Sequence, residues 1–192
     1  MKSTSHNFTL VEILMVIIII AVLMGMLFPA ITGVREQAKK TQAKAEMKSL
    51  EIAIKQYEST YGVLPVASAG SDVALSTAEY EKLISFLSQT GTDQDQGNVR
   101  KIRMLDVDVP GEYKDPWKEE HNKNYRVALD ANYDGEINET VIYGMADNVP
   151  KSVVIWTAGP DGKDSGTDGN DDNQDNLYSV DSNWTPSGHE LK

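Results

Sequence analysis

An apolar stretch near the N-terminus, residues 8–31, limits most strongly what this chain can fold into. It begins Phe8-Thr9-Leu10-Val11-Glu12 and continues as an almost unbroken apolar run over residues 13–31. About 20 apolar residues are enough for a helix to cross a bilayer. The run is longer than the core of a signal peptide, and residues 27–30 are a poor Ala-x-Ala cleavage site. We therefore interpret the stretch as a membrane helix.

Glu12 carries the one charge inside this stretch. An ionised carboxylate in a membrane helix costs about 2.5–3.5 kcal/mol at mid-bilayer and less near the interface. No basic side chain lies within one turn of it. Cleavage between Asn7 and Phe8 would create an amine at Phe8, and this amine can pair with Glu12 of a neighbouring subunit. Without such cleavage, the stretch is a plain membrane anchor and Glu12 lies among the headgroups.

These residues resemble the N-terminus of type IV pilins and pseudopilins. In that family a prepilin peptidase cuts before the Phe and methylates the new amine, so the resemblance implies processing at Asn7 and Phe8. It also implies roles in assembly for Glu12 and Pro29, which fall on a Glu and a Pro of the family's helix. The chain departs from the family at Asn7, where Gly is usual.

A second helical pattern follows the apolar run. Beyond Gly33, apolar residues recur every three or four positions, at Ala43, Met47, Leu50, Ile54, Tyr57 and Tyr61. Glu51 and Lys55 lie off this stripe as a favourable i,i+4 pair. Gly62 and Pro65 end the helix. We expect the stripe to pack on a globular domain, and a kink or local melting at Pro29, which lacks a backbone N–H.

The remaining residues predict a helix and several short strands. Ser76 and Glu79 form a predicted capping box for a helix whose buried face is Tyr80, Leu83, Ile84 and Leu87. Strands are predicted around residues 102–105 and at 125–129, 140–143 and 152–157, which are rich in β-branched or aromatic residues. Short connections favour an antiparallel meander.

The predicted fold class is α+β, with a long N-terminal helix, membrane-spanning in its first half, packed on a small antiparallel β-sheet as a type IV pilin-like roll. The predicted organisation is a leader peptide at 1–7, a transmembrane and assembly helix at 8–31, an amphipathic helix at 32–62, and a globular domain with an acidic C-terminal loop at 63–192.

One acidic loop, residues 130–137, begins like an EF-hand. Asp130, Asn132 and Asp134 stand at positions 1, 3 and 5, with Gly135 at position 6. Position 12 should be a bidentate carboxylate but is Val141, and no helical pattern flanks the loop. A hairpin turn is the favoured interpretation, because Asn and Gly tolerate the left-handed conformation. Weak Ca²⁺ binding by Asp130, Asn132 and Asp134 stays open.

The other acidic loop, residues 159–175, holds six Asp. Their carboxylates repel one another, and a hard cation that takes 6–8 oxygen ligands would offset this repulsion. Without His or Cys nearby, the ligand set favours Ca²⁺ over zinc or copper. A solvated acidic loop is the alternative.

This region resembles the C-terminal loop of type II secretion major pseudopilins. The resemblance is carried by residues 158–162, 166–167, 171–172 and 183–184, and by Asp115-Pro116-Trp117 and the helix end at 61–65. In that family the loop binds one Ca²⁺ through side-chain and main-chain oxygens. The candidate ligands here are Ala158 (through its carbonyl), Asp161, Asp168, Asp171, Asp172 and Asp175.

Composition and motifs argue against an enzyme or a nucleic-acid partner. The three His, at positions 6, 121 and 189, have no recognisable catalytic partner, and the chain has no Cys. From Gly62 onward there are 11 basic and 24 acidic side chains, the wrong sign for binding phosphates.

The family resemblance implies a structural subunit. A prepilin would span the inner membrane once, with its globular domain in the periplasm. After processing and N-methylation it would form a homopolymer, together with minor pseudopilins and an inner-membrane assembly platform. The product would be a pseudopilus fibre for type II protein secretion. The alternatives are a type IV pilin of a surface pilus, used in adhesion or DNA uptake, and an uncleaved membrane-anchored calcium-binding module.

Overall fold

The computed structural model describes residues 9–65, 70–91, 97–121, 123–143, 145, 147–164 and 175–180, without the side chains of residues 26–32. The chain divides into two compact units, Met1–Ala38 and Lys39–Lys192. The leader with Asn7, Phe8, and the candidate calcium ligands Asp168, Asp171 and Asp172 lie outside the described residues, as does the side chain of Pro29.

Helix α1, Leu10–Tyr61, has 52 residues and contributes to both units. It ends before Gly62, as predicted, where the backbone turns left-handed (φ 76°). The helical backbone continues through Pro29, so local melting at that residue, one of the two predicted outcomes, is not found.

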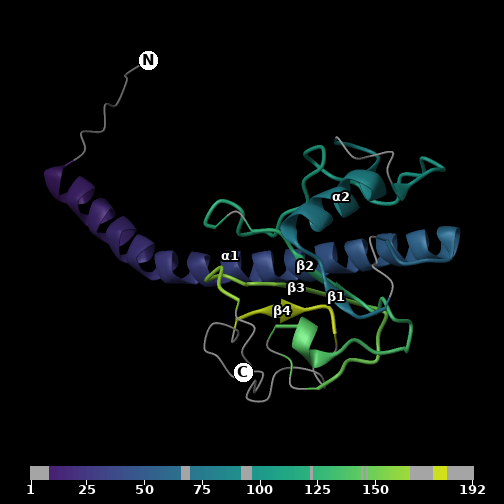
Figure 1. Cartoon of the computed structure of the whole chain (residues 1–192). Helices are drawn as coiled ribbons and strands as arrows, with labels where there is room; N and C mark the ends of the chain where they lie inside the picture. Colours follow the sequence, from purple (N-terminus) through teal and green to yellow (C-terminus); the bar gives the residue numbers. More distant parts are fainter. Residues whose placement is uncertain are drawn as a thin grey trace. The chain divides into compact units, whose positions relative to one another are not determined.

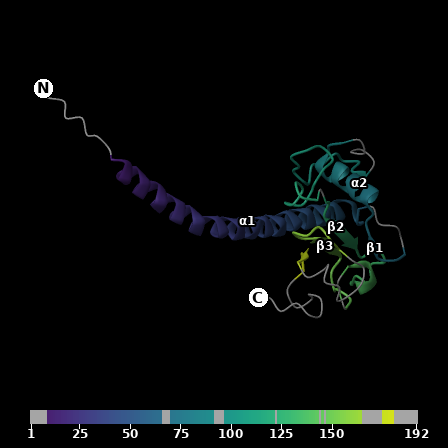
Figure 2. The same ribbon diagram turned by 90° about the vertical axis from the view of Figure 1, so that its left-hand side faces the viewer.

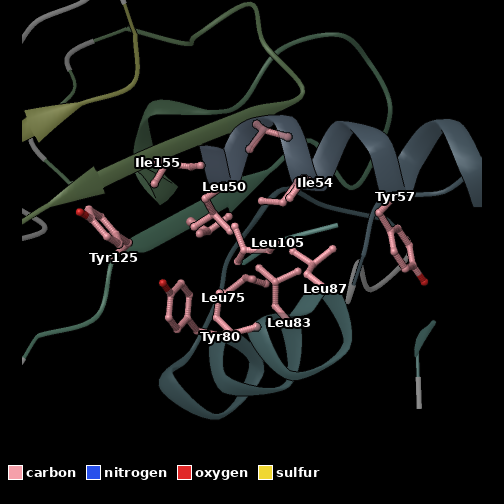
Figure 3. Close-up of a cluster of buried hydrophobic side chains, with 14 of the residues drawn as sticks. Leu50, Ile54, Tyr57, Leu75, Tyr80, Leu83, Leu87, Leu105, Tyr125 and Ile155 are labelled. Carbon is pink, nitrogen blue, oxygen red and sulfur yellow. The ribbon is translucent and has the colours of Figure 1, made fainter. Parts of the chain in front are cut away.

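Residues 39–61 of α1 lie inside the second unit, between helix α2 (Thr77–Ser88) and the β-sheet (Figures 1 and 2). The predicted apolar stripe is confirmed, because its members from Ala43 to Tyr57 are at most 7% exposed. Figure 3 shows Leu50 and Ile54 on the side of α1 that faces Leu83 and Leu87 of α2. The 3.6-residue period therefore places one face of α1 in the core.

The predicted pair of Glu51 and Lys55 is confirmed, and Glu51 is buried as well. It is only 3% exposed, although it lies off the apolar stripe. Lys48 and Lys55, one turn before and after it, hold its carboxylate at 3.0 and 3.1 Å while their own side chains stay exposed. Burial acts to raise the pKa of Glu51, but the hydrogen bonds from Lys48 and Lys55 outweigh burial and hold the pKa below its usual range.

The sheet has four antiparallel strands in the order β1 (Val73–Ala74), β2 (Arg126–Leu129), β3 (Val153–Thr157) and β4 (Leu177–Tyr178). The strands predicted at 125–129 and 152–157 are confirmed as β2 and β3, which pair from Arg126↔Trp156 to Leu129↔Val153. The antiparallel α+β class is thus found.

Two predicted strands are wrong. Residues 140–141 lie in the 3₁₀ helix η1 (Glu139–Val141) and residues 142–143 follow it in a bend and a turn, because the Asn138 side chain accepts hydrogen bonds from the backbone N–H and hydroxyl of Thr140 and turns the chain. Residues 102–105 are not in a strand. Instead they pack beside the last turn of α2, where the N–H groups of Met104 and Leu105 both donate to Leu87 O.

Both faces of the sheet are covered, which the sequence patterns did not predict. Val127, Leu129, Val153 and Ile155 pack against α1 and α2. The alternate residues of the same strands face a second apolar cluster, which contains Ala128, Ile137, Ile142, Met145, Val149, Val154, Trp156 and Val180. The period of two along β2 and β3 thus serves two cores.

The predicted capping box of α2 is confirmed, with Ser76 as its N-cap.

Truncating Ile54 should destabilise the fold strongly, whereas truncating Ile52 should not. Ile54 is fully buried and Ile52 is 55% exposed on the same helix. We expect Ile54→Ala to cost about 2–5 kcal/mol of unfolding free energy. Ile52→Ala, with the same change in chemistry, should stay within about 0.5 kcal/mol. Denaturant titration followed by circular dichroism measures both, and equal losses would contradict the described packing.

Candidate functional site

The first candidate site is the start of α1, where Thr9 and Glu12 form a closed hydrogen-bond pair. The Glu12 carboxylate Oε2 accepts from the Thr9 backbone N–H (2.8 Å) and from its hydroxyl (2.7 Å). The Glu12 N–H in turn faces Thr9 Oγ1 at 3.3 Å. This is a capping box, with Thr9 as N-cap and Glu12 at the third helical position.

The capping box corrects one inference about Glu12. The absence of a nearby basic residue suggested that Glu12 has no partner within its own chain, yet Thr9 provides two donors. The pattern Thr-x-x-Glu before an apolar run is the same signal that predicts the Ser76–Glu79 box, so this partner could have been found from the sequence. Pairing of Glu12 with another subunit stays a prediction.

Next to this pair, α1 presents apolar side chains on every side. The large apolar residues between Leu10 and Met24 are each between 44% and 82% exposed. A contiguous apolar surface of this extent marks a site of protein or membrane interaction. Among the residues whose side chains the structure describes, no helix is long and apolar enough to cross a membrane.

The second candidate site is the turn that follows β3. Gly159 and Gly162 both have left-handed backbones (φ 65° and 67°). A Cβ on Gly159 would lie 2.4 Å from the Asp175 carbonyl oxygen, so only glycine allows this approach. The Asp161 N–H donates to Asp175 Oδ2 at 3.0 Å. Residues 158–161 and Asp175 are therefore brought together, as expected for candidate ligands of one ion.

The charges in this turn are not balanced. Burial raises the pKa of Asp175, and the neighbouring Asp161 carboxylate adds to the rise, although the hydrogen bond from the Asp161 N–H opposes both. Asp164, by contrast, has a cationic partner, because Arg126 binds it through two nitrogens at 2.9 and 3.3 Å. Asp164 is thus engaged in an ion pair, whereas Asp161 and Asp175 are in no described ion pair, and Lys40 acts on Asp175 only as a nearby charge that lowers its pKa.

Two residues that are not among the candidate ligands support this turn. Asp115 is fully buried and accepts hydrogen bonds from the Thr157 hydroxyl (2.7 Å) and the Trp117 N–H (3.1 Å). Burial raises its pKa, and the hydrogen bond from Thr157 opposes the rise. His121 Nε2 lies 3.0 Å from Gly159 O. The Asp-Pro-Trp segment therefore fixes the end of β3 and the turn after it.

The third candidate site is the loop of residues 130–136, which we call the β2 loop because it follows that strand. It forms a turn, but the predicted hairpin is wrong: β2 pairs with β1 and β3, and Ile137 bridges to Val149. Gly135 has the expected left-handed backbone (φ 95°), but Tyr133 (φ 59°) adopts it in place of Asn132.

In the described part of the chain, no three His, Cys, Asp or Glu side chains form a group that could hold a metal ion. Comparisons with protein-family models, with curated proteins and with solved structures gave no match.

Proposed function

We propose that this protein is a structural subunit of a helical fibre, of the type IV pilin-like class. More specifically, we propose a pseudopilin that is processed before Phe8, polymerises from the inner membrane and serves type II protein secretion. The globular domain would be the pilin-like roll of that class. No catalytic step is part of this proposal.

The observation that carries the proposal is the exposed apolar surface of α1. A soluble monomer rarely exposes a contiguous apolar surface beyond a few hundred Å², and here every large apolar side chain from Leu10 to Met24 is exposed. Lipid can cover it before assembly, and copies of the same helix can cover it afterwards. The second unit is compact and buries its own core, so among the described residues it is the first part of α1, residues 10–24, that needs partners.

Glu12 would give the helices a register. In a fibre core, the amine of a processed Phe8 would meet Glu12 of a neighbouring copy. The capping box holds the Glu12 carboxylate at the start of the helix, with one oxygen, Oε2, taking both Thr9 donors. An added ammonium group would neutralise this carboxylate, whose burial without a counter-charge is costly.

Calcium would complete the C-terminal loop. Ala158, Asp161 and Asp175 would contribute to the site, together with oxygens from the segment that contains Asp168, Asp171 and Asp172. A Ca²⁺ ion would offset the two neighbouring carboxylates of Asp161 and Asp175. The site would thereby link the turn after β3 to β4.

A second candidate function is an uncleaved membrane anchor that carries a calcium-binding domain. The observation that favours it is the same capping box, because Glu12 needs no second subunit to satisfy its hydrogen bonds. The two functions differ at the N-terminus of the mature protein.

N-terminal sequencing and intact mass of the membrane-purified protein test this difference. We expect a chain that starts at methylated Phe8, and an intact Met1 would overturn the fibre proposal in favour of the anchor.

Asn7→Gly should be processed faster than the wild type, because Gly is the usual residue before the cut in the resembled family. Pulse labelling in cells with the peptidase, compared with cells that lack it, measures the rate. Ser5→Gly is a control for the added glycine. Equal rates for wild type and Asn7→Gly would mean that the peptidase accepts Asn.

A further inference from the structure

The β2 loop presents oxygens in the order that calcium loops use. The carboxylate of Asp130 accepts from the Gly135 N–H (3.0 Å). Asn132 Oδ1 accepts from the Asp134 N–H, and Asp134 Oδ1 accepts from the Glu136 N–H, both at 3.1 Å. These bonds hold the side chains at positions 1, 3 and 5 of the loop around a turn whose sixth residue is glycine.

The independent observation is a buried oxygen without a partner. Asp130 is only 3% exposed, and no described group donates a hydrogen bond to its Oδ1. The described ion pairs do not include Asp130 either. A buried carboxylate oxygen that lacks both a donor and a counter-charge is costly. The carboxylate is held toward the loop by its bond to Gly135, so a cation there would satisfy it.

A second carboxylate at the same end of the sheet repeats this pattern. Val73 pairs with Leu129 in the antiparallel β1–β2 ladder, so Asp72 stands opposite Asp130 where the ladder ends. Asp72 Oδ2 accepts from the Asn138 N–H at 2.8 Å, and its Oδ1 is also buried without a described partner. Two carboxylates, each with a buried oxygen that has no described partner, thus lie at neighbouring positions where the ladder ends.

We propose that the β2 loop is a second Ca²⁺ site, separate from the C-terminal loop and independent of the assembly proposal. The carboxylates of Asp130 and Asp134 and the amide oxygen of Asn132 are its side-chain ligands, and main-chain oxygens and water complete the shell. An all-oxygen set with an irregular arrangement suits Ca²⁺ better than Mg²⁺, which demands an octahedron.

The affinity should be low, because the loop supplies two carboxylates and Val141 replaces the bidentate Glu of a full EF-hand. We expect a Kd of about 10⁻⁴–10⁻³ M, the weak end of calcium-loop affinities. The ion would also steady the segment that follows α1, because the Tyr133 hydroxyl in this loop accepts a hydrogen bond from the Leu64 N–H (2.7 Å).

Isothermal titration calorimetry of the full chain with Ca²⁺, in detergent micelles, tests the site. Asp134→Asn removes one charged ligand yet keeps an oxygen for the Glu136 N–H. Asp130→Asn removes the charge of the buried ligand and keeps an oxygen for the Gly135 N–H. We expect each to weaken one class of Ca²⁺ binding by at least about tenfold, because affinity follows the ligand charge count. Asp147→Asn, an exposed charge outside the loop, should leave both classes unchanged.

Asp161→Asn separates this site from the C-terminal loop. With Asp161→Asn, binding to the β2 loop should persist, and Tb³⁺ luminescence excited through Tyr133 should fall only when Asp130 or Asp134 is replaced. The proposal is overturned if Asp161→Asn abolishes all Ca²⁺ binding, or if Asp134→Asn titrates like the wild type. Asp134 is exposed, so Asp134→Asn should fold and still test Ca²⁺ binding by the β2 loop if Asp130→Asn fails to fold.

Discussion

Replacing Glu12 with glutamine is expected to stop fibre assembly while leaving the folded domain and membrane insertion unchanged. Glutamine at the third helical position still accepts the two Thr9 donors, so the capping box survives. The charge does not survive, and the amine of a processed Phe8 would then meet no carboxylate in the fibre core. Cross-linking of fibres in cells, followed by immunoblotting, measures the length distribution, and we expect no species beyond small oligomers.

Thr9→Ala is the matched control, because it removes half of the capping box and keeps the Glu12 charge. It should cost about 1 kcal/mol of helix stability and should still give fibres. The opposite outcome, normal fibres with Glu12→Gln and none with Thr9→Ala, would show that Glu12 acts through its own helix alone. These two variants therefore distinguish a register contact from a local cap, which Glu12→Ala by itself would not do.

Removing calcium is expected to lower the melting temperature of the chain. At a free Ca²⁺ concentration 100 times the Kd, a single site adds about 2.7 kcal/mol of stability. For a domain of this size, that is a shift of roughly 5–10 °C. Thermal unfolding in micelles, with Ca²⁺ and then with a chelator, measures the shift. If Asp134→Asn shows the same melting-temperature shift as the wild type, the stabilisation comes from Ca²⁺ at the C-terminal loop.

Asp175→Asn should affect the melting temperature differently with chelator and with Ca²⁺. The pKa of Asp175 is raised by burial and by the Asp161 carboxylate, so above that raised pKa the ionised side chain lowers folding stability. With chelator, Asp175→Asn should therefore melt at or above the wild-type temperature, since Asn still accepts the Asp161 N–H. With Ca²⁺ it should melt lower. A variant that melts lower in both conditions would show a structural role only.

How much of the fold could be predicted depends on the range of the interaction. The stripe from Ala43 to Tyr57 and the Ser76 cap follow from contacts within one or two helical turns, and both are confirmed. β1 and β4 have two residues each, and they are strands because longer neighbours pair with them. A pattern along the chain does not contain that information.

The same limit applies to the candidate sites. The spacing of oxygens in the β2 loop could be predicted, but the burial of Asp130 could not, because it depends on strand ends far along the chain. Glu51 is buried although it lies off the apolar stripe, since Lys48 and Lys55 neutralise it from both sides. The support of Asp115 for the turn after β3 depends on Thr157, which is 42 residues away.

The place of α1 in the core also sets the timing of folding during synthesis. The Tyr125 hydroxyl donates to Glu46, which lies 79 residues earlier, and Ile155 joins the same cluster later still. At translation rates of about 5–20 residues per second, the buried face of α1 waits on the order of ten seconds for these partners. The apolar first part emerges before any of them. The nascent chain must therefore shield two apolar surfaces of α1 in succession, because apolar surface that is exposed during synthesis promotes aggregation.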